Sequence, residues 1–484
     1  MFAGLNGIRQ ARPVTVPSAQ SDRPRKGGEQ LMSIDVLSRS RGRIDAYFGV
    51  ARHGSTMKRE LMAGTVTFLA MSYVLAVNPS VLGDHGQLGA RGIPTQAVFT
   101  ATAVAAVVGT LVMGVWARYP IALAPGMGLN AFFAYSVVLG MGIDWQVALS
   151  GTLLSGIIFF VLAVTKVREK IIDAIPLQLK LSVGAGIGMF VAFLGLKNAG
   201  IVVSDPATFV HLGDFTKGTT LLALFGLLLT VVFLVLGWHG AVLYGIVCTT
   251  VVGIVSGLVH LPHQVVALPH GLDQTFGQAI VHLPDAFTGQ MAIVVLTMLF
   301  VDFFDASGTL IGIANQAGLL GADGKLPRAA QALAADSIGT AAGAVIGTST
   351  TTAYVESTAG VSAGGRTGLT AVSTAGWFLA AMFFFPIFAV VADVPAVTAP
   401  ALIVVGVLMS RALGDIDWGK LEYAIPAFIT VIMMPLTYSI ANGIAMGLTF
   451  YPVVMLARRR GREVHPVMWV LMAIFLAYFF FLAD

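Results

Sequence analysis

Long apolar runs, separated by short polar segments, follow one another along most of the chain. A membrane-crossing helix needs about 20 apolar residues, and such runs recur between residues 61 and 457. The predicted spans lie near 61–81, 97–116, 121–140, 146–165, 176–196, 218–237, 240–258, 289–317, 331–347, 348–364, 368–391, 398–411, 421–438 and 440–457. The pattern therefore predicts an all-α polytopic membrane protein with about 14 transmembrane segments.

The predicted spans form two sets of seven, and this grouping divides the chain into five parts. These parts are a disordered cytoplasmic N-terminal tail (1–45), a first repeat (46–258), an extracytoplasmic loop (259–288), a second repeat (289–458) and a basic loop with a C-terminal apolar helix (459–484). The tail is polar and Arg-rich with no early apolar run, so no cleavable signal peptide is expected. The last apolar run, 466–482, is either a further span or an interfacial helix.

The positions of Lys and Arg set the expected orientation. With the N-terminus in the cytoplasm, the predicted cytoplasmic segments after the first span contain Arg118, Lys166, Arg168, Lys170, Lys325, Arg328, Arg366, Arg411, Lys420, Arg458, Arg459, Arg460 and Arg462. The predicted outer side carries only Arg91, Lys197 and Lys217. Basic residues concentrate on the cytoplasmic side of membrane proteins, so we expect a multi-pass protein of the inner (plasma) membrane with a cytoplasmic N-terminus.

Two weak internal matches support a repeat of seven spans. The segment Ala241–Ile246 resembles Ser439–Ile444, and Gly109–Gly114 resembles Gly339–Ala344. Because seven is odd, the second repeat would be inverted relative to the first. Inverted repeats are typical of secondary transporters.

Composition agrees with the membrane assignment and excludes several other classes. Charged residues make up 11% of the chain, against about 25% in soluble proteins. The net charge of +4 gives no reason to expect a nucleic-acid partner. The single cysteine, Cys248, cannot form an internal disulfide, and no histidine spacing indicates a zinc site. We expect no cofactor and no metal.

The third span of each half is predicted to be broken. Pro125, Gly126 and Gly128 disfavour a continuous helix in the first, and hydroxyl residues occupy 349–352 in the second. Threonine favours extended structure, so each segment is expected to contain a short strand that leads into a half-helix beginning near Asn130 or Glu356. Interrupted segments at matching positions are a sequence indicator of a transporter's binding site. An ordinary proline-kinked helix is the alternative for the first segment.

Acidic residues inside predicted spans are candidates for function because they are costly to bury in a membrane. Asp302 and Asp305 are three residues apart on one helix face, and Glu356 lies in the second broken segment. Two like charges on one desolvated face favour sharing a single proton. Each carboxylate has a purely structural, hydrogen-bonded role as its alternative. Phe132 and Tyr354 flank the broken segments, where their rings would either stack on a planar ligand or simply pack.

Three stretches, Ala124–Tyr135, Phe300–Leu310 and Gly347–Gly360, resemble the AzgA-type purine permeases of the nucleobase–cation symporter-2 superfamily. The resemblance runs from about Arg43 to Pro466. It implies two inverted seven-span repeats, a core and a gate domain, strands in spans three and ten that cross at mid-membrane, and frequent dimers. It also implies adenine, guanine or hypoxanthine as substrate, rather than xanthine or uracil.

The resemblance assigns roles to particular residues. Asp302 matches the acidic residue of span eight, Glu356 that of span ten, Asn130 the polar residue of span three, and Asp305 a second acidic position of the purine branch. The residues expected to bind substrate are Glu356, Asp302, Asn130, Phe132, Tyr354, Val355 and Thr352. The carboxylates would accept N–H hydrogen bonds, and backbone N–H groups near Phe132, Tyr354 and Val355 would donate. Asp305 and Asp302 are expected to carry the coupled proton.

The expected function is uptake of purine nucleobases by proton symport through alternating access, without enzymatic activity. The expected partners are the purine base, the proton, membrane lipid and a second copy of the chain. Two alternatives remain open on the same scaffold: a proton-uncoupled facilitator and an anion transporter of the sulfate-permease type. An intramembrane aspartyl protease is disfavoured, because these spans lack a Gly-x-Gly-Asp motif.

Overall fold

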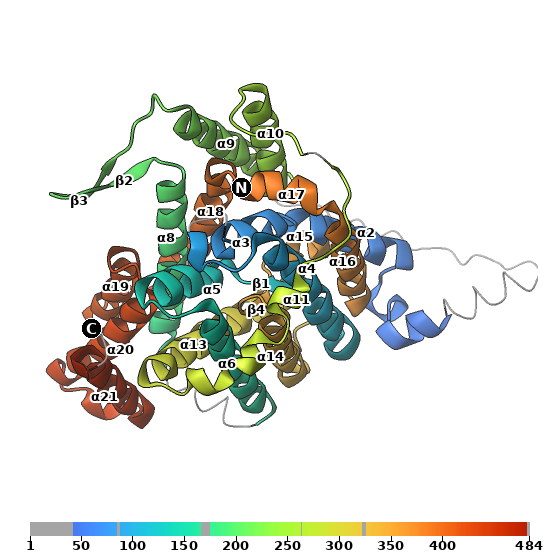
Figure 1. Cartoon of the computed structure of the whole chain (residues 1–484). Helices are drawn as coiled ribbons and strands as arrows, with labels where there is room; N and C mark the ends of the chain where they lie inside the picture. The colour runs from blue at the N-terminus through green and yellow to red at the C-terminus, as the bar shows by residue number, and fades with distance from the viewer. Residues whose placement is uncertain (1–41, 85–87, 166–174, 263, 322–325, 482–484) are drawn as a thin grey trace, which may run out of the picture. The chain divides into compact units, whose positions relative to one another are not determined.

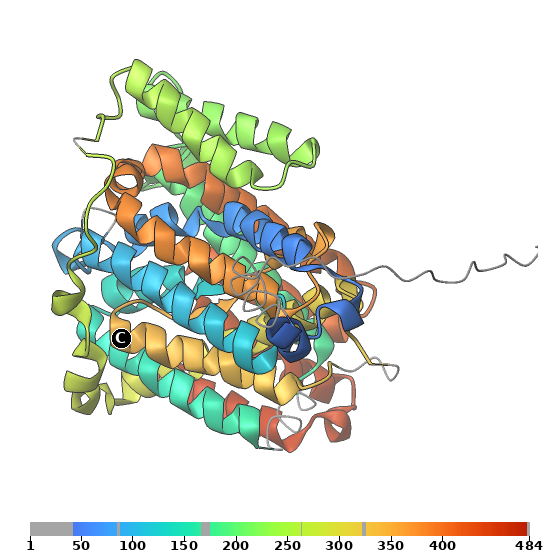
Figure 2. The ribbon, with the colours of Figure 1, turned by 90° about the vertical axis from the view of Figure 1, so that its right-hand side faces the viewer.

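The computed structural model describes residues 42–84, 88–165, 175–262, 264–321 and 326–481 (Figures 1 and 2). Residues 48–484 form one compact unit. Most of the predicted N-terminal tail lies outside the described residues. So do four of the basic residues used to predict the orientation, namely Lys166, Arg168, Lys170 and Lys325.

The structure is built almost entirely from helices. The helices of the first half are α2 (Met57–Met71), α3 (Val74–Leu82), α4 (Thr95–Leu111), α5 (Met127–Ala131), α6 (Trp145–Val164), α8 (Leu177–Asn198), α9 (Gly218–Val235) and α10 (Ala241–Val255). Those that follow are α11 (Leu272–Thr275), α12 (Gln278–Val281), α13 (Gly289–Gln316), α14 (Ala329–Ile346), α15 (Ser357–Ser362), α16 (Gly368–Ala381), α17 (Phe385–Ala392), α18 (Pro395–Met409), α19 (Leu421–Leu436), α20 (Ile440–Ala457) and α21 (Pro466–Phe481).

Among the described residues, ten helical segments are long and apolar enough to cross a membrane. This finding confirms a helical, multi-span membrane protein, whereas the count of 14 spans and their inverted symmetry stay predictions. The first predicted span consists of two helices, because α2 ends at Met71 and α3 begins at Val74. The short turn between them places Tyr73 in the interior of the unit, where its side chain is 1% exposed.

Each of the two segments expected to be broken contains a short strand. β1 (Leu123–Pro125) and β4 (Thr351–Ala353) pair antiparallel, with Ala124 opposite Thr352. All six strand residues are buried. Both strands lie at the centre of the helices in Figure 1. Irregular backbone at membrane depth requires surrounding protein or water, and here the flanking helices provide it.

A helical segment follows each strand and begins close to the predicted point. The first starts with α5 at Met127, three residues before Asn130, and continues as a π-helix over Phe132–Gly140. The second is α15, which begins at Ser357 with Glu356 as its N-cap residue. The first half-helix starts earlier than predicted because Gly126 is already the N-cap residue.

Small residues bring two long helices onto the strands. A methyl group added at Gly109 of α4 would lie 3.2 Å from the Leu123 side chain, and one at Gly339 of α14 would lie 3.3 Å from the same side chain. Around this centre, α6 packs on α14, and α16 packs on α2 and α4. A second group forms where α8 packs on α18 and α19, while α9 packs on α10 and α18.

Two features of the loops were not predicted from the sequence. A hairpin of β2 (Val202–Asp205) and β3 (Phe209–Leu212) connects α8 to α9. Its turn is fixed by Asp205, whose carboxylate accepts 2.8 Å hydrogen bonds from the backbone N–H groups of Ala207 and Thr208. The loop predicted at 259–288 contains the short helices α11 and α12 and one further helical turn.

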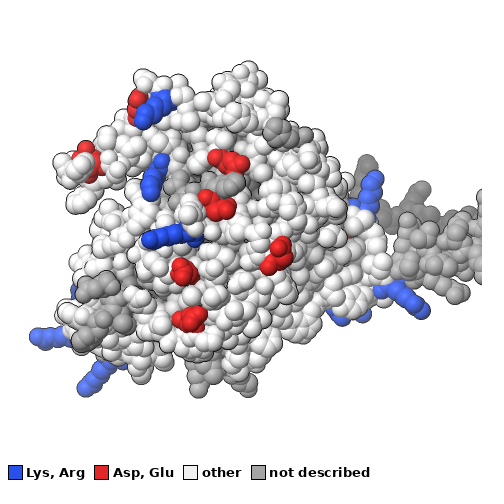
Figure 3. All heavy atoms as spheres, in the orientation of Figure 1, with Lys and Arg blue, Asp and Glu red and all other residues white. Residues whose placement is uncertain are grey.

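The surface of the unit is largely uncharged, as expected for contact with lipid. Most of the face in Figure 3 carries neither Lys, Arg, Asp nor Glu. The most hydrophobic stretch of α9 is only 28% buried, so this helix exposes most of its apolar side chains. Water would not solvate such a surface favourably, which supports its placement in a membrane.

A candidate binding site at the paired strands

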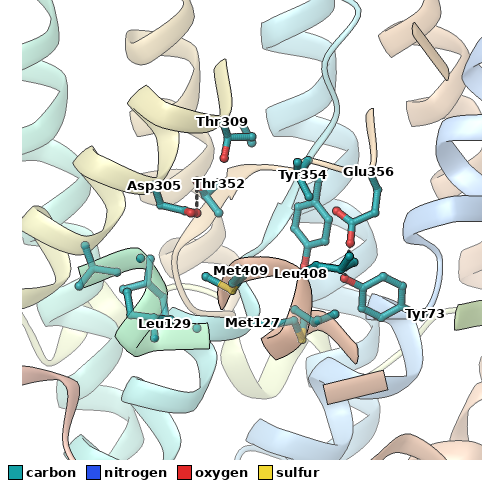
Figure 4. Close-up of a pocket in the computed structure, with 18 residues that line it drawn as sticks. Tyr73, Met127, Leu129, Asp305, Thr309, Thr352, Tyr354, Glu356, Leu408 and Met409 are labelled. Carbon is teal, nitrogen blue, oxygen red and sulfur yellow. Dashed lines mark hydrogen bonds between the residues drawn. The ribbon is translucent and has the colours of Figure 1, made fainter. Parts of the chain in front are cut away.

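A cavity of about 220 Å³ lies beside the ends of β1 and β4. Figure 4 shows side chains from several segments converging on it. It is lined by Tyr73, Gly126, Met127, Gly128, Leu129, Gly184, Ile187, Val301, Asp305, Thr309, Thr352, Ala353, Tyr354, Val355, Glu356, Val405, Leu408 and Met409. Helices α8, α13 and α18 and the segments around both strands therefore all contribute to one site.

Two carboxylates from different elements line the cavity. Asp305 projects from α13, and its Oδ2 lies 3.5 Å from the hydroxyl of Thr352, a long contact for a hydrogen bond. Glu356 follows β4 and accepts a hydrogen bond of 2.7 Å from the Tyr73 hydroxyl. Both carboxylates are partly buried, and no Lys, Arg or His is among the described residues that line this cavity. The wall is thus apolar with two acidic acceptors.

Backbone donors also face this region. Met127, Gly128 and Leu129 form the first turn of the helical segment that starts with α5, and all three line the cavity. The first N–H groups of a helix have no acceptor within the helix. A ligand with ring nitrogens or a carbonyl oxygen would find donors here and acceptors on the two carboxylates.

Tyr354 links the two strand segments. Its hydroxyl donates a 2.6 Å hydrogen bond to the backbone carbonyl of Pro125, and its backbone N–H donates to the carbonyl of Ala122 at 3.0 Å. The hydroxyl is therefore occupied, and the ring is what Tyr354 presents to the cavity. An aromatic ring at this position can stack on a planar ligand.

Five of the residues predicted from the sequence meet at this cavity. They are Glu356, Asp305, Tyr354, Val355 and Thr352. Their convergence shows that α13 and the segment that contains β4 contribute to one cavity.

Three other predicted residues do not line the cavity. Asp302 is fully buried behind β4, where its Oδ2 accepts a 3.1 Å hydrogen bond from Thr340 of α14. Asn130 is also fully buried and accepts a hydrogen bond from the Ser349 hydroxyl. Phe132 is buried in the hydrophobic core. These side chains support the paired segments from behind rather than forming the wall.

Sequence reasoning missed Tyr73 as a site residue. A tyrosine within an otherwise apolar span was the available signal, but its partner Glu356 is 283 residues away in the chain. Asp336 of α14 was not among the predicted site residues either, yet it is fully buried and interacts electrostatically with Asp302 and Asp305. Its position in the sequence, near the start of the predicted span 331–347, did not reveal this burial.

No metal site emerges from the described part of the chain. Within it, no group of three or more His, Cys, Asp or Glu side chains is arranged to hold a metal ion. Cys248 is a free, partly buried thiol of α10.

Comparison with known proteins assigns the family. The sequence matches the Permease family over residues 58–446. The chain belongs to this family. Among its relatives, the guanine/hypoxanthine permease PbuG of Bacillus subtilis (strain 168) is 53% identical over 442 residues, which cover 91% of this chain and 100% of the relative. The adenine permease AdeQ of Escherichia coli (strain K12) is 41% identical over 443 residues, covering 92% and 97%.

Solved structures of other transporters share the fold of this permease. The transmembrane domain of a cyanobacterial bicarbonate transporter, BicA, superposes with a TM-score of 0.57 at 17% identity, over 80% of this chain and 97% of that domain. SLC26A9 gives a TM-score of 0.57 at 11% identity, over 91% and 73%. The family resemblance inferred from the motifs is confirmed, and the permease is an integral membrane transporter rather than an enzyme.

Proposed function

We propose that this permease takes up the purine nucleobases hypoxanthine, guanine and adenine by proton symport. The observation that carries the proposal is the cavity at the paired strands, which has Asp305 on one side and Glu356 on another. Purines present several ring N–H donors and a planar face, and the cavity offers carboxylate acceptors and the Tyr354 ring. The relatives named as guanine/hypoxanthine and adenine permeases support the same substrate class.

In the proposed binding mode, Glu356 accepts a hydrogen bond from an N–H of the base. Backbone N–H groups near Met127 and Val355 donate to ring nitrogens or to the exocyclic oxygen, and Tyr354 stacks on the ring. A hydrogen bond to a charged group contributes about 1.5–3 kcal/mol. Loss of the Glu356 charge would thus weaken binding about 10- to 100-fold.

Asp305 and Asp302 together form the proposed proton site. Asp305 lines the cavity, so it can exchange a proton with solvent or sense the substrate. Asp302 lies three residues earlier on α13 and is fully buried, with Thr340 as a hydrogen-bond donor. Its burial favours a role in proton coupling through Asp305 over direct contact with the base. Asn130, Phe132 and Thr352 are proposed to hold the strand segments in place around the substrate.

The proposed architecture has 14 spans in two inverted repeats, at 46–258 and 289–458, joined by the loop at 259–288. The paired helices around β1 and β4 would form the core domain, and the group of α8, α9, α18 and α19 the gate domain. Alternating access would then be movement of one group against the other. The positive-inside pattern supports a cytoplasmic N-terminus, a cytoplasmic basic loop that begins at residue 459 and precedes the C-terminal apolar helix, and insertion in the plasma membrane. A homodimer is proposed from the family resemblance.

An anion transporter of the sulfate-permease type is the main alternative, because SLC26A9 shares the fold. Such a transporter would be expected to place positive charge at its site. The cavity instead has two carboxylates and, among its described lining residues, no cationic side chain. This charge favours a neutral ligand with N–H donors over an anion.

Uptake of radiolabelled hypoxanthine tests the proposal in cells that lack their own purine permeases. Unlabelled adenine, guanine, xanthine, uracil and sulfate serve as competitors. Competition by adenine and guanine, without competition by uracil or sulfate, is the expected result. Absence of uptake by folded, inserted protein would refute the purine assignment. Collapse of the pH gradient during uptake separates symport from the uncoupled facilitator.

A further inference from the structure

One hydrogen bond on the cavity wall joins two segments that lie far apart in the sequence. The hydroxyl of Tyr73 donates to Oε1 of Glu356 over 2.7 Å. Both residues line the cavity, and Figure 4 shows the phenol hydroxyl directed toward the carboxylate. The first predicted span thus contacts the second strand segment through a site residue.

The fold holds the Tyr73 hydroxyl in a fixed position. Tyr73 is the N-cap residue of α3 in the turn that follows α2, and its backbone carbonyl accepts a 2.9 Å hydrogen bond from the N–H of Val77. Its ring belongs to the hydrophobic core and is 1% exposed. A buried ring with two rotatable bonds has little freedom, so the donor is already oriented before any ligand binds.

This hydrogen bond favours one protonation state of Glu356. A phenol that donates to a carboxylate stabilises the ionised form, because the charged oxygen is the better acceptor. The bond from Tyr73 engages Oε1 of Glu356, and the carboxylate lines the cavity, where it can also accept a hydrogen bond from a ligand. Glu356 is therefore suited to remain an ionised acceptor for an N–H of the substrate.

Asp305 has no comparable donor among the described residues. Its contact with the Thr352 hydroxyl is 3.5 Å long, at the limit of a hydrogen bond. Asp302 lies three residues before it on α13, so a like charge lies nearby. The ionised form of Asp305 is consequently less well stabilised than that of Glu356.

We propose that Tyr73 is a positioning residue that keeps Glu356 ionised and thereby directs the coupled proton to Asp305. This inference rests on the proposed function, since it assigns the proton within the same cavity. The two carboxylates then have different tasks, substrate binding for one and proton transfer for the other. Glu356 binds the base throughout the cycle, and Asp305 gains and loses the proton.

The other titratable groups near Glu356 do not replace Tyr73. Tyr354 faces the same cavity, but its hydroxyl donates to Pro125. The elements packed against α15 are α2 and α13. Their ionisable residues are Lys58, Arg59, Glu60, Asp302 and Asp305, and Arg366 follows α15.

The charges of α2 lie at its far end from Tyr73. Arg59 and Tyr73 are 14 residues apart along two successive helices, which corresponds to roughly 20 Å. Glu60 is occupied at that end, because its carboxylate accepts hydrogen bonds from the backbone N–H groups of Arg366 and Thr367. Tyr73 is thus the donor in direct contact with Glu356.

Equilibrium binding of radiolabelled hypoxanthine to the purified full-length permease in lipid nanodiscs tests this inference. Binding is measured across the mildly acidic to mildly alkaline range for the parent protein and for Tyr73→Phe. The variant is expected to bind more weakly and to lose binding on acidification about one to two pH units earlier, the equivalent of one charge-assisted hydrogen bond. Tyr244→Phe on α10, outside the cavity lining, is the matched control and should follow the parent.

A double-mutant cycle shows whether Tyr73 acts through Glu356. In a Glu356→Gln background, Tyr73→Phe should change affinity by less than about twofold, because no titrating carboxylate remains for the phenol to stabilise. An unshifted pH profile in Tyr73→Phe, or an equal loss of affinity with and without the Glu356 carboxylate, would overturn the inference. If the parent protein binds neither hypoxanthine, guanine nor adenine at any pH, the proposed function itself fails.

Infrared difference spectroscopy provides a measurement that does not depend on the folding of Tyr73→Phe. The carbonyl band of a protonated carboxyl group should change when the pH of the parent protein is lowered. We expect Asp305→Asn to remove this band and Glu356→Gln to retain it. Loss of the band in Glu356→Gln, with retention in Asp305→Asn, would place the proton on Glu356 and refute the assignment.

Discussion

The hydroxyl of Tyr354 and the backbone carbonyl of Pro125 are joined by a 2.6 Å hydrogen bond. This bond connects the residue after β4 to the last residue of β1, so it reinforces a sheet of only three residue pairs. Each strand belongs to a different half of the chain. This side-chain hydrogen bond therefore joins segments from the two halves of the chain beside the cavity.

Tyr354→Phe should destabilise the permease while leaving the ring in the cavity. Removal of the hydroxyl takes away the donor of this short hydrogen bond to the buried Pro125 carbonyl. The loss should lower the free energy of unfolding by about 1–3 kcal/mol. We expect a lower melting temperature in detergent and a smaller effect on hypoxanthine affinity than that of Glu356→Gln. Tyr244→Phe is the control for loss of a tyrosine hydroxyl elsewhere. An unchanged melting temperature would show that the strand pairing does not depend on this bond.

Asp305→Asn should separate proton-driven uptake from substrate exchange. Asparagine retains the shape of the side chain and a polar contact with Thr352. Its amide does not titrate, however, so it cannot take up and release the coupled proton. In proteoliposomes, accumulation of hypoxanthine driven by an imposed pH gradient should fall at least about tenfold, whereas counterflow of labelled for unlabelled base should persist. Uptake that stays fully dependent on the pH gradient would contradict a proton-coupling role for Asp305.

Asp302→Asn should affect coupling more than equilibrium binding. Asp302 is fully buried and is absent from the cavity wall, so its replacement removes no direct contact with the base. Hypoxanthine affinity at neutral pH should change by less than about threefold, against the 10- to 100-fold loss expected for Glu356→Gln. A loss as large as that of Glu356→Gln would indicate direct contact in another conformation. Titration calorimetry on both variants makes this comparison.

The sequence was informative about local structure at the site. Pro125 and Gly126 disfavour a continuous helix, and the hydroxyl run at 349–352 favours extended backbone. Both signals act through neighbouring residues, and the structure has β1 and β4 in these segments. The same reasoning singled out Asp305 and Glu356 because carboxylates are rare inside apolar spans, and both line the cavity.

The sequence was less informative about the directions in which side chains point and about contacts between segments far apart in the chain. Asp302 and Asp305 share a helix face, yet a separation of three residues leaves them about 60° apart around the axis. That angle is enough to direct Asp305 to the cavity and Asp302 to Thr340 of α14. The contact between Tyr73 and Glu356 depends on which helices pack together, and neither periodicity nor composition specifies this.

The hairpin of α19 and α20 depends on glycine at a close helix contact. A methyl group at Gly447 would overlap the hydroxyl of Thr430, which itself is hydrogen-bonded to the Pro426 carbonyl at 2.8 Å. Gly447→Ala should therefore force the helices apart and destabilise the fold by about 1–3 kcal/mol. Gly376 is the matched control, because it is exposed within α16 and a methyl group there would have no neighbour within 4 Å.

The two glycine variants should differ in the sign of their effect. Gly376→Ala removes a flexible residue from a helix and should stabilise the protein by about 0.5–1 kcal/mol, whereas Gly447→Ala should lower the melting temperature and the yield of monodisperse protein. Thermal unfolding followed by size-exclusion chromatography measures both. If Gly447→Ala melts at or above the parent temperature, α19 and α20 cannot pack as closely as their glycine contact requires, and the placement of this hairpin against α8 would have to be revised.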